Sequence, residues 1–165
     1  MSVGYASQAV ATVSAWLPVA HRDGGNIEAR AQLMIGAHLA GRALTLSGLG
    51  LVHGIGHAIT AHTGTPHGIA LAAVLPEVMR LCLPVAQDAY TQAATALRVH
   101  TADAAIAAVG ELCDASAARH RLRDLGVDDA MLGSIAAAAL ADPVTNNSPL
   151  IPAEEQVHTL LSSVH

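Results

Sequence analysis

Residues 48–68 read GLGLVHGIGHAITAHTGTPHG and carry most of the structural information in the chain. A Gly-Thr-Pro turn interrupts the apolar pattern, so we expect one helix over about 50–62 and another over about 68–83. His53 and His57 are four residues apart and therefore lie on one face of the first helix. Two imidazoles at this spacing can chelate a metal ion, although a chain with ten histidines readily contains one such pair by chance.

Four glycines crowd the start of this first helix, at positions 48, 50, 54 and 56. A glycine inside a helix costs about 0.5–1 kcal/mol relative to alanine, and alanine is abundant in this chain. The glycines therefore indicate that something approaches the helix backbone closely. Either a ligand or a neighbouring helix would satisfy this requirement, and both interpretations stay open.

His67 adds a third imidazole just after the proline turn, at the N-terminal end of the next helix. The positive end of a helix dipole disfavours a protonated imidazole, and a metal ligand must be neutral. The turn can fold His67 back toward His53 and His57. Three histidines within fifteen residues indicate part of a metal or proton-transfer site. Ordinary surface or core histidines remain an open alternative. His38 and His62 show no partner in the sequence.

The rest of the chain predicts helices throughout. Hydrophobic residues make up 52% and aromatic residues only 2%, which disfavours an all-β fold. Asn26 and Thr101 are expected helix N-caps, and Pro76 is expected to kink or divide its helix. We predict an all-α helical bundle of about eight helices and a single helical domain over 1–165. The remaining predicted helices cover residues 6–20 (ended or kinked by Pro18), 26–46, 84–98, 102–118, 128–140 and the segment after Pro152.

Several classes of protein are disfavoured. The net charge is −5 with no basic stripe, so we expect no nucleic-acid partner. Histidines, Pro76, Glu77 and Arg80 interrupt the apolar stretch 48–86, so we expect no membrane span. The N-terminus does not resemble a signal peptide, which predicts a cytoplasmic protein whose two cysteines are reduced core thiols. No phosphate-binding loop or glycine-rich dinucleotide motif follows a strand.

Residues 48–84 resemble the signature region of the iron-containing (group III) alcohol dehydrogenases. That family has a G-x-x-H-x-x-x-H segment, matched here by Gly50 to His57. A G-x-P-H-G turn follows, matched by residues 64–68, and then an apolar helix that ends near a proline, here Pro84. Weaker matches are collinear over residues 6–164, among them Trp16-Leu-Pro18 and the Asn26-Ile-Glu-Ala-Arg30 stretch.

The resemblance implies a metal-dependent oxidoreductase fold of which this chain holds only the helical part. In the family, an Asp and three His bind Fe²⁺ or sometimes Zn²⁺, and the last two His match His53 and His67. His57 matches a histidine near the substrate and the nicotinamide, which implies a catalytic role rather than metal binding. The family's Asp, its first His and its α/β nucleotide-binding domain have no counterpart in this sequence.

Two functional expectations follow from this partial match. The chain is expected to be inactive alone, and to work in NAD(P)-linked alcohol oxidation only with a partner chain that supplies the nucleotide domain and the missing ligands. The alternative is a non-catalytic helical interaction module, or a truncated relic of a dehydrogenase, that self-associates into a homo-oligomer through an exposed apolar face. A weak metal-binding helical protein is a third possibility.

Overall fold

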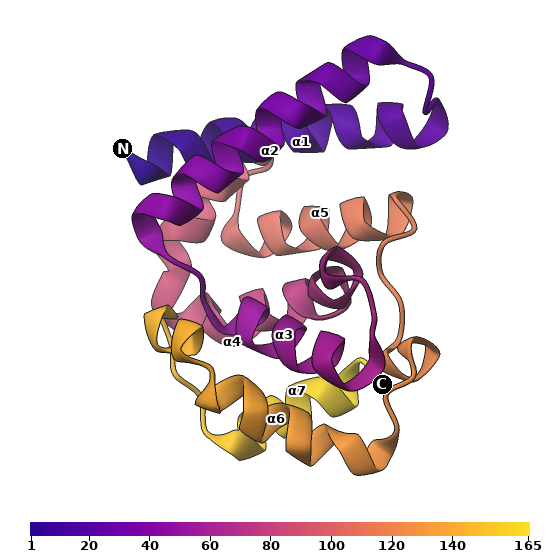
Figure 1. Cartoon of the computed structure of the whole chain (residues 1–165). Helices are drawn as coiled ribbons and strands as arrows, with labels where there is room; N and C mark the ends of the chain where they lie inside the picture. Colours follow the sequence, from indigo (N-terminus) through magenta and orange to yellow (C-terminus); the bar gives the residue numbers. More distant parts are fainter. The chain divides into compact units, whose positions relative to one another are not determined.

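The computed structural model describes all residues 1–165 and contains no β-strand (Figure 1). The all-α prediction is confirmed, with seven α-helices where about eight were expected. The α-helices are α1 (Ser2–Arg22), α2 (Ile27–Ser47), α3 (Leu51–Thr63), α4 (His67–Leu97), α5 (Ala102–Ala115), α6 (Leu132–Ala141) and α7 (Glu154–Ser163). Three short 3₁₀ turns connect them: η1 (Leu122–Leu125), η2 (Asp129–Met131) and η3 (Pro143–Asn147).

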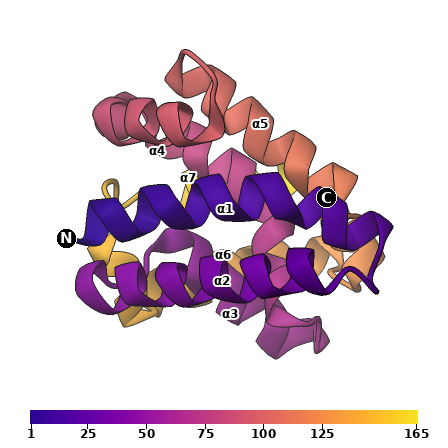
Figure 2. The same ribbon diagram turned by 90° about the horizontal axis from the view of Figure 1, so that it is seen from above.

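The helices form two compact units, each built from two segments of the chain. The first unit contains Met1–Gly48 and Ala86–Ser116, and the second contains Leu49–Val85 and Ala117–His165. Helix α4 contributes its two halves to different units. In the first unit, α1 and α2 lie side by side (Figure 2), and α5 also packs on α1.

The second unit is built around the packing of α3 against α6 and η3, with α7 covering α6. Its interior consists of aliphatic side chains, because the chain has no phenylalanine to fill larger spaces. The largest fully buried aliphatic side chains of this core are Leu51, Ile55, Ile59, Val74, Leu122, Val127, Ile135, Val157 and Leu161.

The expected local signals set several helix ends. The Asn26 side chain accepts a hydrogen bond from the Ala29 amide at 2.9 Å and so caps α2. Thr101 caps α5 in the same way through the Ala104 amide, at 3.1 Å. Gly64 ends α3 in the left-handed conformation at φ 72°, which a residue with a side chain rarely adopts. These boundaries agree with the sequence.

The prolines act differently from the prediction. Pro18 does not end α1, which continues to Arg22, and the break expected at Pro76 is absent. Pro76 is fully buried, so its packing offsets the hydrogen bond that a proline cannot donate. The non-helical residue in α4 is instead Ala86 (φ −123°, ψ 19°), two residues after Pro84.

Two surface properties of the helices bear on function. Helix α4 is long and apolar enough to cross a membrane by length and composition alone. However, 44% of its most apolar window is buried, and core helices of soluble proteins meet the same criteria.

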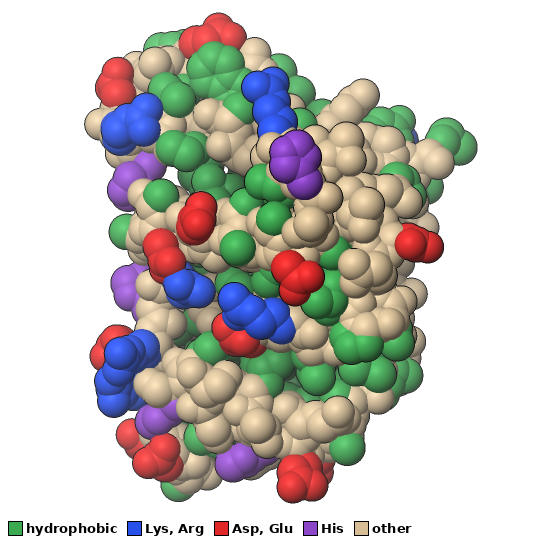
Figure 3. All heavy atoms as spheres, turned by 180° about the vertical axis from the view of Figure 1, so that it is seen from behind, with side chains coloured by type: hydrophobic (Ala, Val, Ile, Leu, Met, Phe, Trp, Pro, Cys, Tyr) green, Lys and Arg blue, Asp and Glu red, His purple; other side chains and the backbone are tan.

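On the face shown in Figure 3, acidic and basic side chains lie interspersed among apolar ones.

Candidate metal centre

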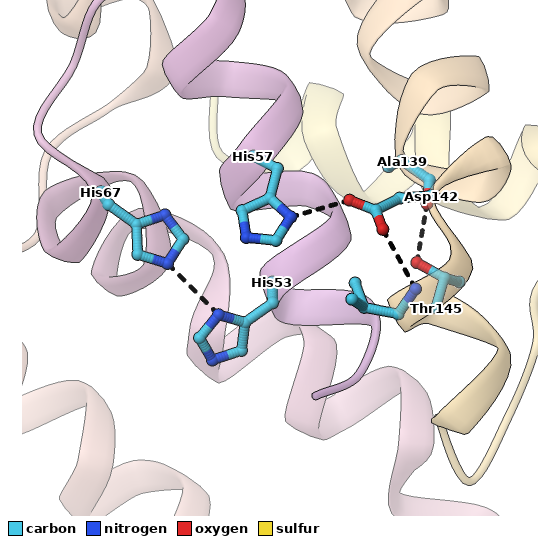
Figure 4. A network of polar contacts seen from close by, with 7 residues as sticks. His53, His57, His67, Ala139, Asp142 and Thr145 are labelled. Carbon is cyan, nitrogen blue, oxygen red and sulfur yellow. Dashed lines mark hydrogen bonds and ion pairs between the residues drawn. The ribbon is translucent and has the colours of Figure 1, made fainter. Parts of the chain in front are cut away.

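The second unit brings together the three histidines that the sequence singled out. His53 and His57 lie one turn apart on α3, and His67 is the first residue of α4. The left-handed turn at Gly64 reverses the chain between them, and a hydrogen bond of 2.7 Å joins the Thr63 and Thr65 hydroxyls across it. The three imidazole centroids lie between 5.1 and 6.0 Å apart, and one nitrogen of each ring lies within 4.8 Å of the others (Figure 4).

His53 and His67 lie closest together, with His53 Nδ1 and His67 Nε2 separated by 3.2 Å. Two nitrogens bound to one tetrahedral ion at 2.0–2.1 Å would lie about 3.4 Å apart, so the pair has the spacing of two ligands of a single metal. Burial lowers the pKa of His53, and the neighbouring His67 and His57 lower it further. This favours the neutral imidazole that a metal ligand must be.

His57 is held by a carboxylate that the sequence did not indicate. Its Nδ1 lies 2.7 Å from Asp142 Oδ2, while Asp142 Oδ1 accepts a hydrogen bond from the Val144 amide at 3.0 Å. The bond from His57, followed by that from Val144, holds the pKa of the Asp142 carboxyl below its usual range. A carboxylate on Nδ1 keeps the proton on that nitrogen, so Nε2 of a neutral His57 is an acceptor.

The absence of a side chain at Gly54 makes the contact between His57 and Asp142 possible. A Cβ on Gly54 would lie 2.2 Å from Thr145 Oγ1 and 2.8 Å from the Ala139 carbonyl oxygen. The Thr145 hydroxyl in turn donates to that carbonyl at 2.7 Å, at the end of α6. Of the two interpretations left open for the glycines, a neighbouring element therefore applies at Gly54. Its effect is to bring α6 and η3, and with them Asp142, against α3.

The remaining histidines do not join the cluster. His62 has partners that the sequence did not reveal, since its Nδ1 lies 2.7 Å from the Ala58 carbonyl oxygen and its Nε2 lies 3.2 Å from the Ser134 hydroxyl. The expectation that His62 lacks a partner was therefore wrong. Ser134 comes from α6, so the contact depends on tertiary packing rather than on sequence spacing.

Comparison with known proteins agrees with the resemblance that the sequence motifs indicate. The family model described as "Fe-containing alcohol dehydrogenase family, C-terminal" matches residues 3–165. The chain is 35% identical over 151 residues to the probable alcohol dehydrogenase EutG of Escherichia coli K12, covering 90% of this chain and 38% of that protein. It is 34% identical over 133 residues to the lactaldehyde reductase of the same strain, covering 76% of this chain and 35% of the relative.

The fold agrees with solved structures over nearly the whole chain. A crystal structure of 1,3-propanediol oxidoreductase superimposes with a TM-score of 0.94 and 27% sequence identity, covering 99% of this chain and 45% of that one. The chain thus spans less than half the length of the relatives it matches.

Proposed function

This chain belongs to the iron-containing alcohol dehydrogenase family, as its C-terminal helical domain, and we propose that it supplies two metal ligands and a proton carrier to an NAD(P)-linked oxidoreductase of alcohols and aldehydes. The observation that carries the proposal is the 3.2 Å approach of His53 Nδ1 to His67 Nε2, with His57 beside them. We assign His53 and His67 as metal ligands and His57 as the catalytic residue.

The two ligands fit a divalent transition-metal ion. The family name supports Fe²⁺, and imidazole suits Zn²⁺ equally well, so zinc is the alternative. When bound, such an ion polarises the oxygen of an alcohol or carbonyl as a Lewis acid. His53 and His67 would hold the ion where α3 meets α4, because the turn at Gly64 brings the two imidazoles together.

His57 is placed to move a proton. Its side chain is 42% exposed, so a small substrate can approach it, while Asp142 on Nδ1 keeps Nε2 available as acceptor. Asp142 is therefore a positioning residue that acts through His57.

The nicotinamide cofactor requires polypeptide beyond the helices described above. The chain spans less than half the length of its relatives, and it contains no strand on which a dinucleotide fold could be built. We propose that NAD(P) is bound by a further polypeptide segment, in the same chain or in a partner chain, which also supplies the remaining metal ligands. These 165 residues alone would then not oxidise alcohols. The names of the relatives support a short alcohol or diol as substrate.

We also propose a cytoplasmic location, on the evidence of the cysteine residues. The thiol of Cys82 is free and buried, which suits a reducing compartment.

A domain replacement tests this function directly. In E. coli lactaldehyde reductase, the segment that matches this chain is replaced by residues 1–165, and nicotinamide-dependent alcohol oxidation is measured. We expect activity that His53→Ala and His67→Ala abolish, and that His57→Ala lowers about 10²- to 10⁴-fold in kcat. His38→Ala, an exposed site on α2, is the matched control. A folded, metal-loaded chimera without activity would overturn the proposal, as would activity that survives His53→Ala.

The second candidate function is a helical module that self-associates. It is favoured by the outer face of α2, where Ile27, Met34, Ile35 and Leu46 are between 51% and 75% exposed. A homo-oligomer formed through this face would need no metal and no cofactor.

A further inference from the structure

We propose that Ser134 and His62 form a nucleophile–base pair, and that the Ser134 hydroxyl accepts acyl groups from activated acyl donors such as aryl esters and thioesters. Neither residue belongs to the cluster of His53, His57 and His67. The inference therefore holds whether or not the chain takes part in the oxidation of alcohols.

Helix packing places the two side chains opposite each other. His62 continues the face of α3 that carries Ile59 and Ile55, which lie one and two turns earlier and are fully buried. Ser134 is in the first turn of α6, next to the fully buried Ile135. The packing of α3 against α6 brings Ser134 Oγ to 3.2 Å from His62 Nε2.

The Ala58 carbonyl sets the tautomer that His62 needs in order to act as a base. His62 Nδ1 lies 2.7 Å from this oxygen, which can only accept a hydrogen bond, so Nδ1 carries the proton. In the neutral ring, Nε2 then presents its lone pair to the Ser134 hydroxyl. A hydroxyl within about 2.6–3.2 Å of a base that a third group orients is the arrangement found for activated serine nucleophiles.

The Ser134 hydroxyl is accessible and has a second acceptor within reach. Both Ser134 and His62 are exposed, so a small acyl donor can approach the oxygen. The hydroxyl has one proton, and the Met131 carbonyl oxygen lies 2.9 Å away as an alternative acceptor. A carbonyl cannot take the proton away at neutral pH, whereas an imidazole can, so attack proceeds from the arrangement in which the hydroxyl donates to His62.

The acylation step needs only these two side chains and the acyl donor. Ser134 Oγ forms a bond to the acyl carbonyl carbon while its proton passes to His62 Nε2. The bond from that carbon to the leaving group breaks, and the leaving group departs with the electron pair. His62 then releases the proton to water, and nothing is oxidised or reduced.

The chemical class of the donor follows from what the pair supplies. A nucleophile and a base are sufficient where the leaving group is a weak base, such as a phenolate or a thiolate. Hydrolysis of the resulting serine ester must instead expel an alkoxide, which is a far poorer leaving group. We therefore expect the acyl group to accumulate on Ser134, as acyl-enzymes do when their formation is faster than their breakdown.

The test is acetylation of the 165-residue chain by p-nitrophenyl acetate. Samples are quenched in acid at successive times, and peptide mapping by mass spectrometry gives the rate at each serine. Release of nitrophenolate is not the readout, because exposed imidazoles also react with this ester. We expect acetylation of Ser134 to be at least about 10²-fold faster than that of Ser162, in keeping with the contribution of a general base.

Ser162 is the matched internal control, because it is exposed and also lies near an imidazole. Its hydroxyl is 3.5 Å from His158 Nδ1 and donates to the His158 carbonyl oxygen at 2.9 Å. Any serine with an imidazole nearby would react alike if proximity were sufficient. Equal rates at Ser134 and Ser162 in the wild-type chain would overturn the proposal, whatever the variants do.

Two substitutions separate the base from the hydrogen bond. Glutamine can still bond to a hydroxyl but cannot take its proton, so His62→Gln should lower the rate at Ser134 to that of Ser162. His158→Gln should leave the rate at Ser134 unchanged. Circular dichroism checks that both variants remain helical. A wild-type rate at Ser134 in His62→Gln would show that His62 is not the base and would overturn the proposal.

Discussion

The hydrogen bond from His57 to Asp142 sets the tautomer of an exposed imidazole. His57 is 42% exposed, so packing alone does not hold its ring. The carboxylate accepts from Nδ1 at 2.7 Å and is itself held by the Val144 amide. The proton-carrier role proposed for His57 requires a free Nε2.

Removing the Asp142 carboxylate should release this constraint. In Asp142→Ala we expect neutral His57 to populate both tautomers, whereas in the wild type the proton stays on Nδ1. Long-range ¹H–¹⁵N spectra distinguish the two forms. Asp142→Asn is the matched variant, because its amide oxygen can still accept from Nδ1 and should preserve the wild-type tautomer. An unchanged spectrum in Asp142→Ala would show that the contact does not set the tautomer.

Cys82 is expected to be unreactive in the folded protein. Its side chain is buried in α4, and burial raises the pKa of the thiol, so at about pH 8 the thiolate fraction is smaller in the folded chain than in the unfolded one. In a Cys113→Ser background, labelling by a disulfide reagent should therefore be slow until denaturant unfolds the chain. Equal rates with and without denaturant would contradict this expectation.

At the scale of elements, the contact of α3 with α6 and η3 depends on the missing side chain at Gly54. A Cβ there would overlap Thr145 Oγ1 and the Ala139 carbonyl oxygen. Thr145 is fully buried and the carbonyl is backbone, so neither can move away cheaply. The glycine lowers the intrinsic stability of α3 but permits the approach that places Asp142 beside His57.

Gly54→Ala should therefore destabilise the protein, by about 1–3 kcal/mol, despite the better helix propensity of alanine. Gly41→Ala is the matched control, since Gly41 lies inside α2 with nothing within 4 Å of an added Cβ. That substitution should stabilise the chain by up to about 1 kcal/mol. Denaturant unfolding followed by circular dichroism measures both changes. A stabilising Gly54→Ala would mean that α3 and α6 are packed less closely than described.

At the scale of the whole molecule, the outer face of α2 carries apolar side chains that neither unit covers. Ile27 is 75% exposed and Met34 is 74% exposed, and Ile35 and Leu46 lie on the same side. Exposed apolar patches of this kind mark interaction surfaces in soluble proteins. This chain spans less than half the length of the relatives compared above, and we propose that a further polypeptide segment covers this face when it is present.

The isolated chain should accordingly self-associate at tens of micromolar. Sedimentation velocity over a dilution series should show a concentration-dependent dimer or larger species, because burying this face removes apolar surface from water. A Met34→Lys/Ile35→Lys double variant should remain monomeric, while Thr159→Lys, at an exposed position on α7, should behave like the wild type. A wild-type chain that stays monomeric throughout would contradict the prediction.

The sequence predicted those helix ends and helix faces that depend only on residues close together in the chain. The composition predicted an all-α fold, and Asn26, Thr101 and Gly64 each marked a helix boundary through hydrogen bonds or backbone conformation within a few residues. The spacing of His53 and His57 likewise placed both on one helix face. The family resemblance, confirmed by the match over residues 3–165, rested on the G-x-x-H-x-x-x-H segment that ends at His57 and on the G-x-P-H-G turn that contains His67.

Tertiary packing alone determined the rest. Asp142 lies 85 residues from His57, and no periodicity or cap in either segment indicates that the two would meet. The contact exists because Gly54 lets α6 and η3 approach α3. The break in α4 lies at Ala86 rather than at Pro76, since burial of Pro76 outweighs its local preference. Helix caps and faces are set by neighbours along the chain, whereas the partner of His57 is set by how closely helices pack.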